Sequence, residues 1–132
     1  MKLSRAIIHS DGASRGNPGL AAIGVTVKDE LGGLLAAISQ SIGRATCNQA
    51  EYGAVIAGLE KAIELGAKYV DIKLDSQLVV RQISGQYRVK NTALKPLYQR
   101  VKQLESHLER FTITHIPREQ NKEADRLANK AL

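Results

Sequence analysis

The amino-acid sequence predicts an α/β fold, in which a mixed sheet of five strands is flanked by helices. Three observations favour this class. Apolar residues alternate along short segments near the N-terminus, as they do in half-buried strands. After residue 46 the apolar spacing changes to a helical period. Strand-like and helix-like segments then follow one another, as in α/β packing. The predicted order of elements is βββαβααβα.

Three strands are expected in the first third of the chain. The first runs from about Arg5 to Asp11 and is expected to end at Asp11 and Gly12, because the segment DGASRGNPG supplies three glycines and a proline. Gly32-Gly33 permits a tight hairpin between the second and third strands. Apolar residues alternate along the second strand, at Ile23, Val25 and Val27. An antiparallel meander is therefore predicted.

The strongest helical pattern covers residues 46–65. Its apolar stripe consists of Val55, Leu59, Ala62 and Ile63. Two capping boxes compete at its start, one formed by Thr46 and Gln49 and the other by Asn48 and Glu51. The two boxes would start the helix two residues apart, and the sequence does not decide between them.

Strands and helices alternate in the rest of the chain. The segment YVDIKLD is a predicted strand that ends at Asp75, and SQLVVRQISG is a short helix closed by glycine. A second long amphipathic helix is expected over about residues 92–109. The strand RFTITHI then ends at Pro117. A closing helix is expected to run to the C-terminus, with Ala124, Leu127, Ala128 and Ala131 on its apolar side.

Length and composition favour one domain, residues 1–132, in an intracellular setting. The chain has 19 Lys and Arg against 13 Asp and Glu, a formal charge of +6, which favours a polyanionic partner but is also typical of a charge that serves solubility alone. Cys47 is the only cysteine, so no intrachain disulfide is possible. Without a signal-like or membrane-spanning stretch, we expect a cytoplasmic protein with no membrane partner, and a monomer by default.

Four acidic residues stand where the pattern alone does not explain them. Asp11 and Asp75 end predicted strands, Glu51 lies early in the main helix, and Asp125 lies in the last helix. Each also has a structural explanation: turn or cap for the first two, helix dipole for Glu51, surface charge for Asp125. Glu51 fits this explanation least well, because it shares the apolar stripe that should face the sheet.

Clustered carboxylates repel one another unless a cation lies among them. Mg²⁺ prefers oxygen ligands and takes one or two carboxylates together with water and phosphate oxygens. Two such ions, about 4 Å apart, can support hydrolysis of a phosphodiester. Zinc is poorly supported, because one cysteine and three scattered histidines give no ligand spacing.

Four segments resemble, in order and spacing, the signature segments of the RNase H type I family: DGASRGNPGLAAIGV, TCNQAEYGAVIAGLEKA, LDSQLVV and HIPREQNKEADRLAN. The resemblance covers essentially the whole chain. It implies an RNase H-like fold and a ribonuclease that cuts the RNA strand of an RNA/DNA hybrid, leaving 5′-phosphate and 3′-hydroxyl ends. It also implies that two Mg²⁺ ions, or Mn²⁺ in their place, bind the catalytic carboxylates Asp11, Glu51, Asp75 and Asp125.

The resemblance leaves one catalytic role open between two residues. His115 matches the family's mobile histidine, which assists proton transfer or the release of metal and product. Alternation also puts His115 on the strand face of Phe111 and Ile113, which favours a packed histidine instead. In some relatives with the PRE loop an arginine at the position of Arg118 takes the role. We place His115 slightly ahead.

Substrate contacts are implied in the same way. Asn17 and Asn48 match residues that contact RNA 2′-hydroxyl groups. Thr46 matches a residue that binds a DNA phosphate, although capping the helix is its other expected role. Gly12 is expected to let the backbone approach the RNA. Asn121 is expected either to hold Asp125 in place or to cap the last helix.

The sequence also departs from the family. Cys47 replaces an asparagine, and the extra basic helix that some members insert after the short helix is absent, as is a separate hybrid-binding domain. Binding is then expected to depend on scattered cations, Arg81, Arg88, Lys90 and Lys95, and to be weak and salt-sensitive. The alternatives to a hybrid nuclease are a catalytically silent binding domain of the same fold and a junction resolvase or transposase core.

Overall fold

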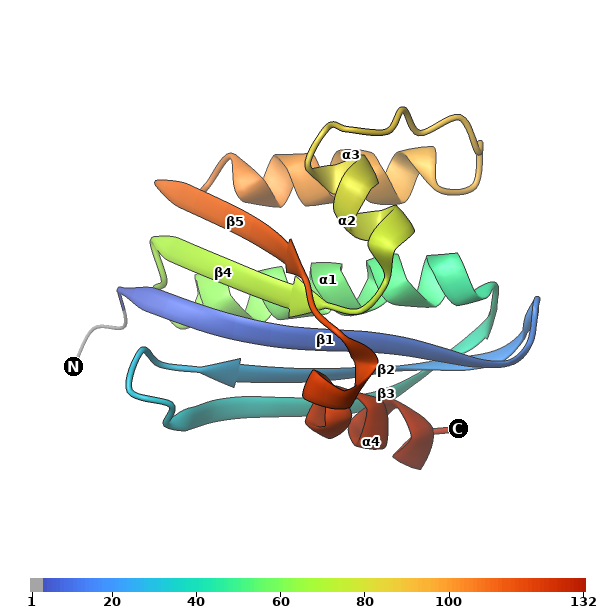
Figure 1. Ribbon diagram of the computed structural model, residues 1–132, viewed down its shortest axis with the longest axis horizontal. Coiled ribbons are helices and arrows are strands. Elements are labelled where there is room, and N and C mark those ends of the chain that lie inside the picture. Colours follow the sequence, from blue (N-terminus) through green and yellow to red (C-terminus); the bar gives the residue numbers. More distant parts are fainter. Residues whose placement is uncertain (1–3) are drawn as a thin grey trace.

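The computed structural model describes residues 4–132 as one mixed sheet with helices on both faces (Figure 1). The strand order is β3-β2-β1-β4-β5. β1, β2 and β3 pair antiparallel, whereas β4 and β5 run parallel to β1. The predicted fold class and element order are confirmed. The strands are β1 (Arg5–Gly16), β2 (Gly19–Lys28), β3 (Leu34–Ala45), β4 (Tyr69–Leu74) and β5 (Arg110–His115).

The helices are divided between the two faces of the sheet. α1, α2 and α3 share one apolar core with the sheet, whereas α4 packs on the opposite face, over β1 and β2 (Figure 1). Among residues 4–132, no helix combines the length and the hydropathy that crossing a bilayer requires. The helices are α1 (Cys47–Glu64), α2 (Gln77–Ile83), α3 (Lys95–Glu105) and α4 (Lys122–Lys130), and a 3₁₀ turn, η1 (Arg118–Gln120), precedes α4.

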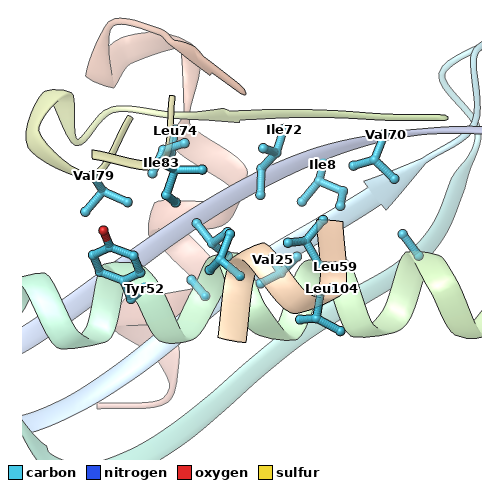
Figure 2. Close-up of a cluster of buried hydrophobic side chains, with 14 of the residues drawn as sticks. Ile8, Val25, Tyr52, Leu59, Val70, Ile72, Leu74, Val79, Ile83 and Leu104 are labelled. Carbon is cyan, nitrogen blue, oxygen red and sulfur yellow. The ribbon is translucent and has the colours of Figure 1, made fainter. Parts of the chain in front are cut away.

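The core lies between the sheet and α1 (Figure 2). Leu59 of α1, Ile8 of β1 and Ile72 of β4 belong to this cluster and are fully buried. Tyr52, one of the largest buried side chains, donates its hydroxyl to Gln82 Oε1 at 2.7 Å, so its polar end is satisfied. The predicted apolar stripe of the main helix is confirmed, and this packing fixes α1 against the middle of β1.

The first strand is longer than the sequence predicted. β1 does not end at Asp11 and Gly12 but continues to Gly16, and the chain turns at Asn17-Pro18 before β2. Gly12 is a strand residue that pairs with Ile23, and a Cβ there would lie within 3.0 Å of the α1 backbone at Ala50 and Glu51. The glycine therefore serves close packing of a helix and not a turn, and Asp11 lies inside a strand.

Helix boundaries are otherwise close to expectation. Thr46 caps α1, and both halves of its box with Gln49 form, which decides between the two competing boxes. α3 is shorter than predicted: it ends at Glu105, about four residues early, and begins at Lys95, about three residues late, because Asn91 and the following residues form a turn stabilised by the Asn91 side chain. α4 ends at Lys130 and not at the last residue.

Candidate active site

The site forms where β1 and β4 separate. Lys73 pairs with His9, so continuing the parallel register by two residues brings Asp75 level with Asp11. β4 ends at Leu74, and the chain leaves the sheet for α2. Beyond this point the edge of β1 is open on the β4 side. The structure thus confirms that Asp11 and Asp75 approach one another, although only Asp75 follows the end of a strand.

Glu51 reaches the same point from the α1 face of the sheet. It lies in the second turn of α1 and is 8% exposed. Its Oε1 accepts the backbone N–H of Gly12 at 3.0 Å, which is possible because Gly12 lets the helix come so close. Its Oε2 is buried without a hydrogen-bond donor from residues 4–132. A buried oxygen of this kind is a candidate ligand for a cation.

Three carboxylates meet closely enough to share an ion. One oxygen each from Asp11, Glu51 and Asp75 lies within 4.8 Å of the others. Hard divalent cations bind such oxygen-only sets, and the orphaned Glu51 oxygen belongs to this one. The residues present therefore fit a divalent metal ion.

The electrostatics of the site agree with this geometry. Burial raises the pKa of Asp11 to about 7; the adjacent Glu51 carboxyl group opposes the rise, and the charges of Asp75 and Asp125 add to it. Burial also raises the pKa of Glu51 well above its usual value, and the charge of Asp11 raises it further. The folded chain therefore holds carboxylates that are costly to ionise together.

Asp125 joins the site from the other face of the sheet. It lies in α4, interacts with Asp11, and lines the same cleft. It does not belong to the group of three acids whose oxygens lie within 4.8 Å of one another. Asn129, one helical turn further on, donates to Asp125 Oδ1 at 3.1 Å, and Arg118 approaches the same oxygen at 4.0 Å. Four carboxylates predicted from the sequence are thus brought together.

A cleft of about 700 Å³ surrounds the carboxylates. Besides the four acids, its lining includes predicted site residues, namely Gly12, Asn48, His115 and Arg118. His115 is exposed at the end of β5, where it pairs in register with Leu74, so the alternative of a packed histidine is wrong. Arg118 is more exposed still, with 80% of its side chain accessible.

Two further predicted residues lie beside the cleft lining: Thr46 at the start of α1, and Asn17 in the β1–β2 turn that contacts it. Thr46 Oγ1 accepts the N–H of Gln49 at 3.1 Å, so its capping role is confirmed. Asn17 Oδ1 accepts the N–H of Cys47 at 3.0 Å, which joins the β1–β2 turn to the helix. The cap bond uses a lone pair of the threonine oxygen and leaves its hydroxyl proton free to be donated elsewhere.

The side chain of Asn121 plays neither of its two expected roles. It is the N-cap residue of α4 but makes no side-chain cap bond, and it does not hold the Asp125 carboxylate. Instead it is 1% exposed, and its Nδ2 donates to the carbonyl of Ser10 at 2.9 Å. The short stretch η1 turns the chain so that this side chain points back to β1. Asn121 therefore attaches α4 to the strand that carries Asp11.

Asn129 was missed by sequence reasoning, although its spacing of four residues from Asp125 places it on the same helical face. Ser14 was also missed; it lines the cleft, and its Oγ donates to the carbonyl of Ala45 at 3.1 Å. No sequence signal distinguished this serine, because it became visible only once β1 was known to run past Gly12.

The fold and the site together define the class of RNase H-like proteins with a carboxylate metal centre. The family described as reverse transcriptase-like matches residues 9–131. The N-terminal RNase H domain of Rv2228c from Mycobacterium tuberculosis superposes with a TM-score of 0.94 at 45% identity, covering 96% of this chain and 98% of that one. RNase H1 of Halobacterium salinarum also gives 0.94, at 43% identity and 97% of each chain.

The full-length relatives are longer than this chain. The bifunctional protein Rv2228c is 45% identical over 97% of the chain, which spans 35% of that protein. The ribonuclease HI of Halobacterium salinarum is 44% identical over 97% of the chain, which spans 64% of that enzyme. A structure of LC11-RNase H1 in complex with an RNA/DNA hybrid is 41% identical, with a TM-score of 0.91 over 96% of this chain and 95% of that one. The chain belongs to the RNase H type I family.

Proposed function

We propose that this chain is a hybrid-specific endoribonuclease, a single RNase H domain over residues 1–132 that hydrolyses the RNA strand of RNA/DNA hybrids. One observation carries the proposal: carboxylates from one strand, from the end of a second strand and from two helices, distant in the sequence, line one open cleft. Membership of a family whose relatives include ribonuclease HI supports the same reaction. The products are expected to be 5′-phosphate and 3′-hydroxyl ends.

The carboxylates are proposed to hold two Mg²⁺ ions, with Mn²⁺ able to replace them. Asp11, Glu51 and Asp75 offer one group of oxygens, and Asp125 extends it on the α4 side. When bound, such ions activate a water for attack on the scissile phosphate and stabilise the leaving oxygen. The chain's own contribution is to keep acids with raised pKa values ready to give up their protons to bulk solvent when a cation arrives.

His115 is proposed to move protons at the edge of the cleft. Its imidazole is exposed, lines the cleft and comes from β5, which carries none of the four acids, and we propose that it donates the proton to the leaving 3′-oxygen. Arg118 is already within 4.0 Å of Asp125. We propose that the arginine orients this acid or a phosphate and that His115 carries the proton.

The start of α1 is proposed to bind both strands of the hybrid. Asn48 lines the cleft, and Asn17 is oriented by its bond from Cys47 N–H, so both amides can contact 2′-hydroxyl groups. Thr46 is expected to donate its hydroxyl to a DNA phosphate while its oxygen still caps the helix. Gly12 provides backbone close to the RNA.

A second cleft, of about 940 Å³, is proposed to take the duplex further from the reaction centre. It lies between the segment after α2 and the start of α3, and its lining includes Arg88, Lys90 and Lys95 together with Tyr98. Arg81 stacks on Tyr87 nearby, at 5.2 Å from the ring centre. These cations replace the extra basic helix, and binding through them is expected to be salt-sensitive.

Cleavage of matched duplexes tests the proposal. The chain is expected to cut a labelled RNA/DNA hybrid with Mg²⁺, to leave it intact with EDTA, and to leave RNA/RNA and DNA/DNA duplexes of the same sequence largely uncut. Binding of the hybrid without cleavage under any divalent metal would instead identify the catalytically silent alternative. Cleavage of a branched DNA would favour a resolvase. The cytoplasmic location and the monomeric state expected from the sequence stay predictions.

A further inference from the structure

Gly24 lies directly opposite Asp11 in the antiparallel pair of β1 and β2. Residues opposite one another in such a pair point to the same face of the sheet. That face is the one that α4 covers, whereas the neighbouring Val25 points into the core on the α1 side (Figure 2). Asp11 and Gly24 therefore lie side by side beneath α4.

The backbone of α4 rests on Gly24. A Cβ built at this position would lie within 3.0 Å of Ala124 O and of Ala128 N, a distance that real Cβ atoms essentially never show. Both atoms are backbone, so rotating a side chain cannot relieve the overlap. The absence of a side chain at residue 24 therefore sets how closely α4 can approach the sheet.

Asp125 is carried by this same turn of α4, next to Ala124. The turn is tied down around Gly24 by three contacts: Asn121 donates to Ser10 O at 2.9 Å, Lys28 pairs with Glu123 at 2.8 Å, and Ser39 Oγ donates to Leu127 O at 2.6 Å. They draw α4 towards β1, β2 and β3. None of these three contacts involves Asp11, Glu51, Asp75 or Asp125.

We infer that Gly24 is a positioning residue for Asp125: the bare backbone at this point lets α4 seat closely enough for its carboxylate to join Asp11 in the metal centre. The same strand pair thus uses two glycines, Gly12 to admit Glu51 on one face and Gly24 to admit Asp125 on the other. The inference rests on the proposed function for its kinetic consequence, but its geometric consequence does not depend on activity.

The test is a Gly24→Ala variant combined with a longer acid. Gly24→Ala is expected to move α4 outward and to lower kcat on the hybrid by about tenfold or more, with KM nearly unchanged, because small displacements of a catalytic group have large effects. Mn²⁺ affinity, measured by calorimetry without substrate, is expected to fall by about tenfold. Asp125→Glu alone is also expected to lower kcat, since the native spacing suits aspartate.

The double variant decides the question. The extra methylene of glutamate spans the added separation, so Gly24→Ala with Asp125→Glu is expected to exceed Gly24→Ala in both kcat and Mn²⁺ affinity. A merely structural role predicts that the two losses multiply. Gly53→Ala is the matched control, because a Cβ there meets only ordinary contacts at 3.6 and 3.8 Å, and it should leave both quantities unchanged.

Two results would overturn the inference: wild-type kcat and Mn²⁺ affinity in Gly24→Ala, or multiplied losses in the double variant. If Gly24→Ala does not fold, Asn121→Ala replaces it, because losing the bond to Ser10 also loosens α4 and should be rescued by Asp125→Glu in the same way. If the wild-type chain does not cut the hybrid, the proposed function fails, while the Mn²⁺ affinities of the variants still decide the positioning role.

Discussion

Glu51 accepts a hydrogen bond from the backbone N–H of Gly12, the residue directly after Asp11. This bond links the helix that carries one acid to the strand that carries another. It forms because Gly12 has no side chain to hold α1 away. The close approach of the α1 and β1 backbones thus brings the Glu51 and Asp11 carboxylates together.

Replacing a central carboxylate by its amide is expected to abolish cleavage and leave the fold intact. Asp11→Asn and Asp75→Asn should each lower kcat by at least about a thousandfold, since an amide cannot supply the charge that binds a divalent ion. Asp71→Asn is the control: Asp71 pairs with Arg5 at 2.8 Å, away from the cleft, and its loss should leave kcat unchanged. Substantial activity in Asp11→Asn would rule out the proposed metal centre.

Without metal, the chain should become less stable as the pH rises. The pKa of Asp11 is about 7 in the folded chain and near 3.8 in an unfolded one, so the folded state binds more protons between about pH 4 and pH 7. The free energy of unfolding should therefore fall across this window and level off above it. Thermal unfolding in EDTA at pH 5 and pH 8 measures the effect. Mg²⁺ should restore stability at pH 8, and Asp11→Asn should flatten the decline.

Two substitutions separate the roles of Thr46. Thr46→Ala should cost about 1 kcal/mol of stability through loss of the cap and should also raise KM for the hybrid. Thr46→Asp should keep the cap, because aspartate is a good N-cap residue, and should raise KM more strongly, because its charge repels a phosphate. Unfolding midpoints and KM values check both. An unchanged KM in Thr46→Asp would leave Thr46 with the capping role alone.

His115→Ala should lower kcat by about a hundredfold or more, the usual contribution of proton transfer by a side chain. Arg118→Ala should lower it less, because the arginine reaches Asp125 only at 4.0 Å. His115→Ala should also change the shape of the pH profile of kcat, which Arg118→Ala should not. A larger loss of kcat in Arg118→Ala than in His115→Ala would assign the catalytic role to Arg118 instead of His115.

The basic cleft should make hybrid binding depend on salt. Neutralising Arg88, Lys90 or Lys95 should weaken binding and reduce the slope of log K against log salt by about one for each phosphate that the cation no longer neutralises. Lys61→Gln is the control, since Lys61 pairs with Glu64 on α1 and is absent from that cleft. A slope that these substitutions do not change would place the duplex elsewhere.

Periodicity and the family segments were sufficient for the element order and for the four acids. The alternation of strands and the apolar stripe of α1 follow from burial, which a sequence displays directly. The meeting of the acids was implied by the resemblance, and the register of β1 with β4 supplies its physical reason. Glu51 was the best local clue, because a buried position on an apolar stripe rarely carries an unpaired acid.

The errors arose where a residue's role depends on a distant backbone. Gly12 follows an aspartate in a glycine-rich segment, which is typical of a turn. In the structure, the α1 backbone occupies the space where its side chain would be. Asn121 has the position of a cap, but η1 turns its amide towards Ser10, more than a hundred residues earlier. Gly24 gave no signal at all. Such roles depend on tertiary contacts and produce no periodic pattern of residues that the sequence could reveal.

Glu51 and Asp125 approach Asp11 from opposite sides of a single sheet, so the thickness of one strand, and not the packing of one helix on another, governs their separation. Most large apolar side chains lie on the α1 side, remote from α4. Substitutions among these core side chains are therefore expected to change the position of Glu51, which α1 carries, before they change that of Asp125 on the opposite face.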